Sequence, residues 1–87
     1  MYENVKKILD KSRATGEDVL VSADMVMAEE GRTDGLKTAK EVVDKYYDTI
    51  TKCRREKDEN TIKALCDALE KGNMAEVTKI KAEVKAR

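Results

Sequence analysis

Cys53 and Cys66 offer the widest range of chemistry in this 87-residue sequence. Two thiols on either side of a turn near residue 59 can form a redox pair or hold a metal ion. Zinc, however, normally takes four ligands, and the sequence has no histidine and no further cysteine. Each cysteine also falls on an apolar helical stripe, where cysteine serves as a small hydrophobic residue. We therefore interpret both as buried structural thiols and expect neither a metal nor a cofactor.

Catalytic groups are sparse. Without histidine, the commonest general base is missing, and so are the Cys–His and Ser–His nucleophilic arrangements. No two carboxylates come together on an otherwise apolar face, which is how tuned acid–base pairs are built. The four glycines stand singly or far apart, so no phosphate-binding loop is present. The sequence predicts a protein that is not an enzyme, with an enzyme subunit completed only within an oligomer as a further alternative.

Basic residues gather in two places. The densest positive patch consists of Lys52, Arg54, Arg55 and Lys57, and a second group near the end of the sequence comprises Lys79, Lys81, Lys85 and Arg87. Binding of nucleic acid requires such residues on one surface, preferably with stacking aromatic rings. Acidic residues interrupt both groups, no aromatic residue lies among them, and 18 acidic residues balance 18 basic ones. A solvated helix surface is the preferred interpretation, and nucleic-acid binding through residues 52–57 is the alternative.

The composition favours helices. Proline is absent, and helix-forming residues such as Ala, Leu, Lys and Glu are common. Charged residues interrupt the first eleven positions, so no signal-peptide core is visible, and no apolar run is long enough to span a membrane. We expect a cytoplasmic protein without a membrane partner.

Residues 2–30 contain two helical stripes. The first includes Val5, Ile8 and Leu9, and the second begins at Val19 and ends before Gly31. Thr15 with Asp18 three residues later has the pattern of a helix start. The stripes stay in phase across Gly16, so one continuous helix is an open alternative, as is a short strand at residues 19–21.

The clearest segment spans residues 34–57, with Thr33 or Asp34 as its cap. Apolar residues recur there at alternating steps of three and four, which predicts one long helix with a continuous seam. Asp48 and Lys52 have the i, i+4 spacing of an ion pair. The seam consists of Leu36, Ala39, Val43, Tyr46, Ile50 and Cys53.

Two shorter helices follow, each with its own start signal. Asp58 or Asn60 caps the first, and Asn73 caps the second after the stop at Gly72. Short turns favour antiparallel neighbours. The sequence predicts an all-α single domain over residues 1–87, a small antiparallel helical bundle of four to five helices around a long central helix.

Four apolar residues exceed what the main stripes require: Val21, Met25, Val42 and Tyr47. They belong either to a wide core face or to a contact surface for another protein or a second copy of the chain. We interpret the chain as a non-catalytic helical interaction module, an adaptor, inhibitor or small regulatory subunit that occupies a partner surface. A homo-oligomer is one form of this hypothesis, because the core is small and lacks Phe and Trp.

Overall fold

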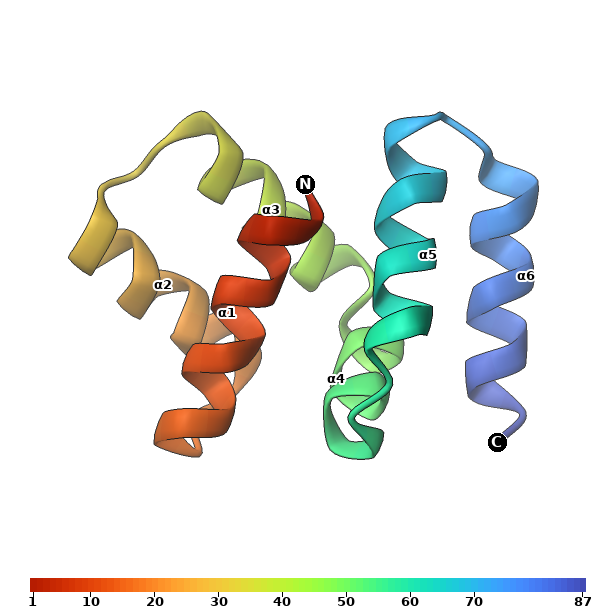
Figure 1. Cartoon of the computed structure of the whole chain (residues 1–87), viewed down its shortest axis with the longest axis horizontal. Coiled ribbons are helices and arrows are strands. Elements are labelled where there is room, and N and C mark those ends of the chain that lie inside the picture. Colours follow the sequence, from red (N-terminus) through yellow and green to blue (C-terminus); the bar gives the residue numbers. More distant parts are fainter. The chain divides into compact units, whose positions relative to one another are not determined.

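The computed structural model describes residues 1–87 and contains six helices and no strand (Figure 1). The prediction of an all-α protein of the small helical-bundle class is confirmed, although the helices number six rather than four to five. None of them has the length and apolar character that crossing a bilayer requires. The helices are α1 (Tyr2–Thr15), α2 (Val19–Glu30), α3 (Asp34–Lys45), α4 (Tyr47–Glu56), α5 (Glu59–Glu70) and α6 (Met74–Lys85).

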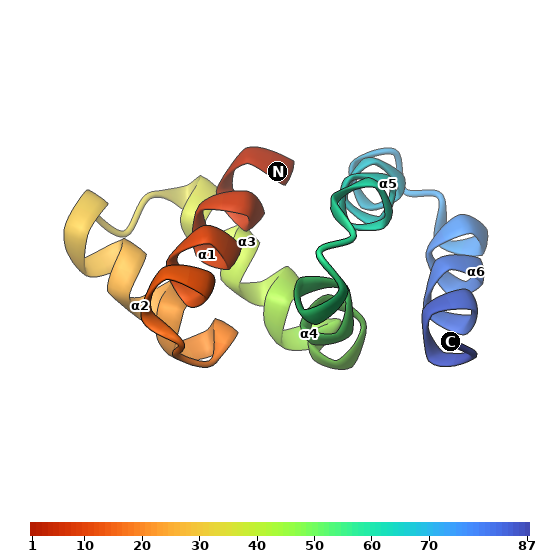
Figure 2. The same cartoon turned by 60° about the horizontal axis from the view of Figure 1, so that its bottom comes forward.

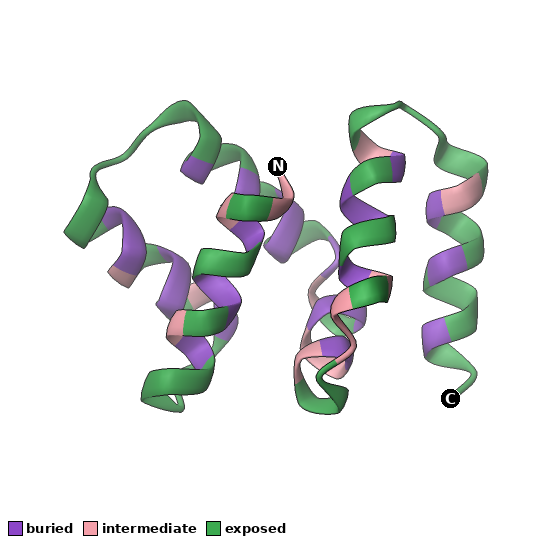
Figure 3. Cartoon of the chain, viewed as in Figure 1, coloured by how far each residue is buried: buried purple, intermediate pink, exposed green.

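The chain divides into two compact units, Met1–Tyr47 and Asp48–Arg87. The expectation of a single domain therefore stays a prediction. In the first unit, α1, α2 and α3 pack against one another, as Figures 1 and 2 show from two sides. Each of the six helices buries residues on one side, so that purple positions recur along every ribbon in Figure 3. The predicted stripe of α1 is buried as expected, including Val5, Ile8 and Leu9.

The turn between α1 and α2 decides the question of one helix or two. Gly16 adopts the left-handed conformation, with φ of 76° and ψ of 3°, and this ends α1. The alternatives of one continuous helix and of a strand at residues 19–21 are therefore wrong. Asp18, not Thr15, caps α2, because its carboxylate accepts a hydrogen bond from the backbone N–H of Leu20.

Two buried serines close the same turn. The hydroxyl of Ser12 donates to the backbone oxygen of Glu17 at 2.5 Å, and that of Ser22 donates to the backbone oxygen of Asp18 at 2.8 Å. A buried hydroxyl is costly unless it is hydrogen-bonded, and both of these are. The two serines therefore fix how α2 leaves α1 and which face of α2 turns inward.

The predicted long central helix is wrong, because the chain breaks at Tyr46 between α3 and α4. Tyr46 has φ of −110° and ψ of 36°, outside the helical region. Tyrosine favours a helix only weakly, so two adjacent tyrosines do little to keep the helix continuous. Tertiary contacts position both side chains: the ring of Tyr46 is buried, and the hydroxyl of Tyr47 donates a hydrogen bond to Asp18. The seam itself is confirmed, since all six of its predicted residues are buried.

In the second unit, α5 and α6 form a helical hairpin that is visible in both views (Figures 1 and 2). Arg87, just beyond α6, joins the three helices of this unit through its guanidinium group. Its Nη1 atom donates to Glu56 at 2.9 Å and to Asp58 at 2.6 Å, and Nη2 donates to Thr61 at 3.2 Å. The end of α6 is thereby held beside the end of α4 and the start of α5.

Asp58 is the cap of α5, as one of the two sequence alternatives predicted. Its carboxylate accepts hydrogen bonds from the backbone N–H of Thr61 at 3.0 Å and from the hydroxyl of Thr61 at 2.6 Å. These bonds, followed by the contact with Arg87, lower the pKa of Asp58. The stabilisation that Asp58 contributes is therefore present above its pKa in the unfolded chain and is lost as the pH falls through the lower pKa of the folded state.

We predict that Asp58→Ala lowers the free energy of unfolding by about 1 kcal/mol, because it removes a helix cap. Asp58→Asn retains most of the stability, since asparagine caps a helix equally well. Denaturant unfolding at neutral pH measures both. The control is Asn60→Ala, at an exposed position in the first turn of α5. We expect it to change the free energy of unfolding by no more than about 0.5 kcal/mol. Equal losses for Asp58→Ala and Asp58→Asn would mean that the ionic contact with Arg87, not the cap, stabilises this end of α5.

Candidate functional site

The outward face of α2 carries an apolar stripe in the first unit. Val21, Met25 and Ala28 follow one another at i, i+4 and i+7, the spacing that places residues on one side of a helix. Val21 is 46% exposed, Ala28 is exposed and Met25 is half-buried. The opposite face of the same helix is buried in the core, so α2 is apolar on two sides.

The other two predicted partner-binding residues lie differently. Val42 is only 8% exposed and belongs to the core, as the alternative of a wide core face predicted. Tyr47 is half-buried, and its hydroxyl donates to Asp18, the cap of α2. The structure thus brings Val21 and Met25 together on one surface and gives Val42 and Tyr47 structural contacts. Val42 is buried because the core face of α3 is wider than its seam, which is the first of the two alternatives that the sequence left open.

Residues of the predicted basic patch differ in exposure. Arg55 and Lys57 are exposed, whereas Lys52 and Arg54 are half-buried. The ammonium group of Lys52 donates to the backbone oxygen of Arg87 at 2.7 Å. The predicted ion pair with Asp48 does not form, because Lys52 is directed toward the end of α6 instead.

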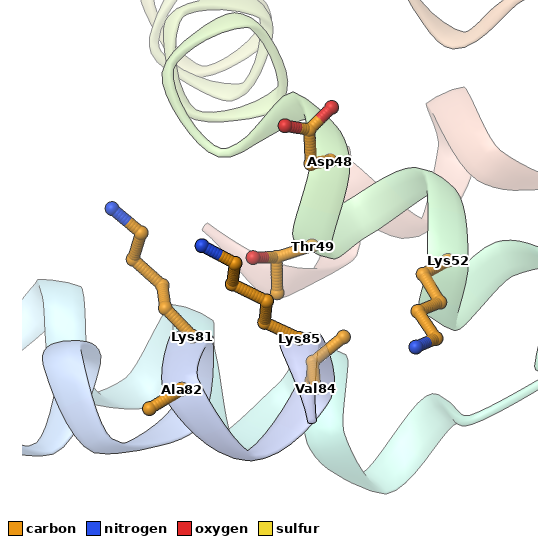
Figure 4. Close-up of a pocket in the computed structure, with 7 residues that line it drawn as sticks. All are labelled: Asp48, Thr49, Lys52, Lys81, Ala82, Val84 and Lys85. Atoms are coloured by element: carbon orange, nitrogen blue, oxygen red, sulfur yellow. The ribbon is translucent and has the colours of Figure 1, made fainter. Parts of the chain in front are cut away.

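A pocket of about 440 Å³ lies between α4 and α6, entirely within the second unit (Figure 4). Asp48, Thr49 and Lys52 line it from α4. From α6, Lys81 and Lys85 reach toward α4, and Ala82 and Val84 supply an apolar surface. The fold therefore gathers members of both basic groups of the sequence around one cavity.

Sequence reasoning identified neither the pocket nor the part that Thr49 plays in it. The two basic groups are about thirty residues apart along the chain, and only the packing of α4 beside α6 joins them. One signal was present: Lys81 and Lys85 are four residues apart, as are Asp48 and Lys52, so each pair lies on one helix face. Which two faces meet is a tertiary property that this spacing does not encode.

Both cysteines are buried free thiols. Burial is the main cause that raises the pKa of Cys53, and also that of Cys66, from 9.0 to about 11. A thiol reacts and binds metals as the thiolate, so both groups are poor nucleophiles and poor ligands at neutral pH. No group of three or more Cys, Asp or Glu side chains is arranged to hold a metal ion.

Comparison with known proteins identified no similar protein. No family model matches the chain, and neither a curated protein nor a solved structure does. A function must therefore be inferred from the exposure and chemistry of the residues themselves.

The raised pKa values predict slow, pH-dependent labelling of the native thiols. At pH 8 roughly 0.1% of a thiol with a pKa near 11 is ionised, against roughly 10% for one with a pKa near 9. Labelling with a thiol reagent should accordingly be about 100-fold slower than in the unfolded chain, and its rate should rise about tenfold per pH unit. Stability should fall above pH 9, since the unfolded chain then loses thiol protons that the folded chain retains.

A stopped-flow labelling series from pH 7 to pH 10, with guanidinium-unfolded protein as the control, measures these rates. Rapid labelling of either native cysteine at pH 7 would show that its thiol is accessible and ionised, contrary to this interpretation.

Proposed function

We propose that the chain is a small non-catalytic helical interaction module, an adaptor, inhibitor or small regulatory subunit that occupies the surface of a partner protein. The observation that carries this proposal is the outward apolar stripe of α2, formed by Val21, Met25 and Ala28. Apolar residues exposed side by side, with polar groups around them, are typical of protein-binding surfaces. Methionine suits such a surface because its side chain adapts to the shape of a partner.

The surroundings of the stripe resemble the rim of an interface. Asp24 lies on one side of the stripe and pairs with Lys40 of α3 at 2.7 Å. Glu29 lies on the other side and pairs with Lys11 of α1 at 2.7 Å. Such exposed ion pairs add little to stability. They do neutralise acidic side chains of α2, so a partner that approaches the apolar stripe is not repelled by a strong negative electrostatic potential.

We propose a non-catalytic protein because the side chains that commonly act as nucleophiles or general bases are missing or buried. The chain has no histidine, and its two thiols are buried with raised pKa values. The ordinary nucleophile and general-base arrangements are therefore not available within one chain. These properties favour a protein that acts by binding a partner over one that catalyses a reaction.

The proposal predicts that Val21→Glu strongly reduces partner capture while the protein remains folded. An exposed site tolerates the change, so the melting temperature should stay within a few degrees of the parent value. Loss of a central apolar contact should weaken binding by about 2 kcal/mol, which is roughly a 30-fold change in affinity. The measurement is affinity capture from the native host with quantitative mass spectrometry, followed by titration of the captured protein.

Met74→Glu is the matched control, because Met74 is 51% exposed but lies on α6 in the other unit. We expect this variant to capture the same partner as the parent chain. Loss of capture by Met74→Glu with retention by Val21→Glu would contradict the assignment to α2. If the partner is a second copy of the chain, light scattering should give a dimer mass for the parent and a mass near 9.8 kDa for Val21→Glu.

The alternative is a nucleic-acid-associated protein that uses the patch of residues 52–57. Its support is weaker, because the carboxylates of Glu56, within this patch, and of Asp58, directly after it, lie beside the basic residues and bind Arg87. Binding of this kind depends steeply on salt, since phosphate contacts release counterions. If the alternative holds, affinity for a single-stranded oligonucleotide should fall at least tenfold between about 50 mM and 200 mM salt. The α2 proposal instead predicts no measurable binding of the oligonucleotide at either salt concentration.

A further inference from the structure

The pocket between α4 and α6 has the size of a small-molecule site. Its volume of about 440 Å³ lies in the range of about 300–1,000 Å³ that such sites occupy. It combines an apolar wall from Ala82 and Val84 with a few polar groups from both helices. A concave surface with a small number of convergent polar groups is how proteins orient small ligands.

Thr49 supplies the most informative of these polar groups. Its side chain is buried, at 7% exposure, and lines the pocket. In Figure 4 its hydroxyl is directed toward the end of Lys85. Unlike the buried serines of the α1–α2 turn, Thr49 forms no hydrogen bond within the chain. The buried side-chain oxygen that lacks a partner is that of Thr51. The Thr49 hydroxyl is instead accessible from the pocket and can donate a hydrogen bond to a molecule bound there.

The charges around Thr49 indicate which kind of molecule the pocket can hold. Lys81 and Lys85 extend from successive turns of α6 toward α4, and Lys52 adds a third ammonium group from α4. Lys85 forms no ion pair or hydrogen bond within the chain. Asp48 is the only carboxylate side chain in the lining, so the pocket carries a net positive charge. An anion with several acceptor oxygens satisfies this arrangement.

We propose that this pocket binds a small organic phosphate that also carries hydroxyl groups. The phosphate lies between the ammonium groups of Lys81 and Lys85 and accepts a hydrogen bond from Thr49. Its three terminal oxygens match three donors that come from two helices, whereas a carboxylate offers only two oxygens in one plane. Asp48 can only accept hydrogen bonds, so it selects a ligand with a hydroxyl donor beside its phosphate. This inference is independent of the α2 surface, which belongs to the other unit.

Glucose 6-phosphate is a suitable probe, because it joins a phosphate to several hydroxyls. Titration into ¹⁵N-labelled protein at constant ionic strength should give saturable shifts of the amide signals of residues 48–52 and 81–85. Glucose, which lacks the phosphate, should give none. Gluconate, which replaces the phosphate by a carboxylate, should bind at least tenfold more weakly.

Two variants test the assigned roles. Lys85→Met keeps the aliphatic stem and removes the charge, and we expect it to raise the dissociation constant about tenfold. Thr49→Val keeps the shape and removes the hydroxyl, and we expect an increase of about fivefold with an unchanged or higher melting temperature. Lys79→Met is the matched control, because Lys79 is exposed on the same helix but does not line the pocket. It should change the dissociation constant less than twofold.

The proposal is overturned if glucose 6-phosphate gives no saturable shifts, if gluconate binds equally well, or if all three variants behave alike. Binding of a single-stranded oligonucleotide without binding of glucose 6-phosphate would also overturn it and would favour the nucleic-acid alternative. Because Val21→Glu leaves the pocket intact, phosphate binding by that variant separates this test from the test of the α2 surface.

Discussion

Burial of narrow aliphatic stripes is the interaction on which the rest of the structure depends. The helices have 10–14 residues, a length at which an isolated helix is marginal in water. Without Phe or Trp, the core contains the ring of Tyr46 and otherwise only aliphatic and small side chains, so the helices approach closely. Ala23 of α2 and Ala39 of α3 are fully buried and permit this approach in the first unit. In the second unit, Leu65 of α5 and Ile80 of α6 are buried on the hairpin that these helices form. Each helix is stable because its neighbours cover its stripe.

Turn chemistry determines which stripe of a helix is covered. In the first unit, Gly16 ends α1, and the hydroxyls of Ser12 and Ser22 bind the backbone of the turn that follows. These bonds fix the rotation of α2 about its axis. With Val19 and Val26 turned inward, Val21 must face outward. The exposed stripe that supports the proposed function is therefore a consequence of how the turn is built, in a helix whose composition is apolar on both sides.

Local features of this fold could be predicted from the sequence, and features that depend on distant contacts could not. Periodicity predicted the buried stripes, and residue type predicted the caps Thr33 and Asn73, because both signals act within one helix. The break at Tyr46 was not predictable in this way, since the seam of α3 continues in phase through it. For the same reason the pocket could not be predicted, because its lysines belong to helices about thirty residues apart.

The basic residues near the pocket divide into structural and binding roles according to what they contact. Lys52 holds the end of α6 through the backbone oxygen of Arg87, and Arg87 in turn holds Glu56 and Asp58. These contacts join the end of α6 to α4 and to the start of α5. Lys85 takes no part in them and extends into the pocket instead. From the patch that appears densest in the sequence, Lys52 therefore shapes the pocket. Lys81, Lys85 and Thr49 supply the atoms that contact the phosphate in the site that we propose.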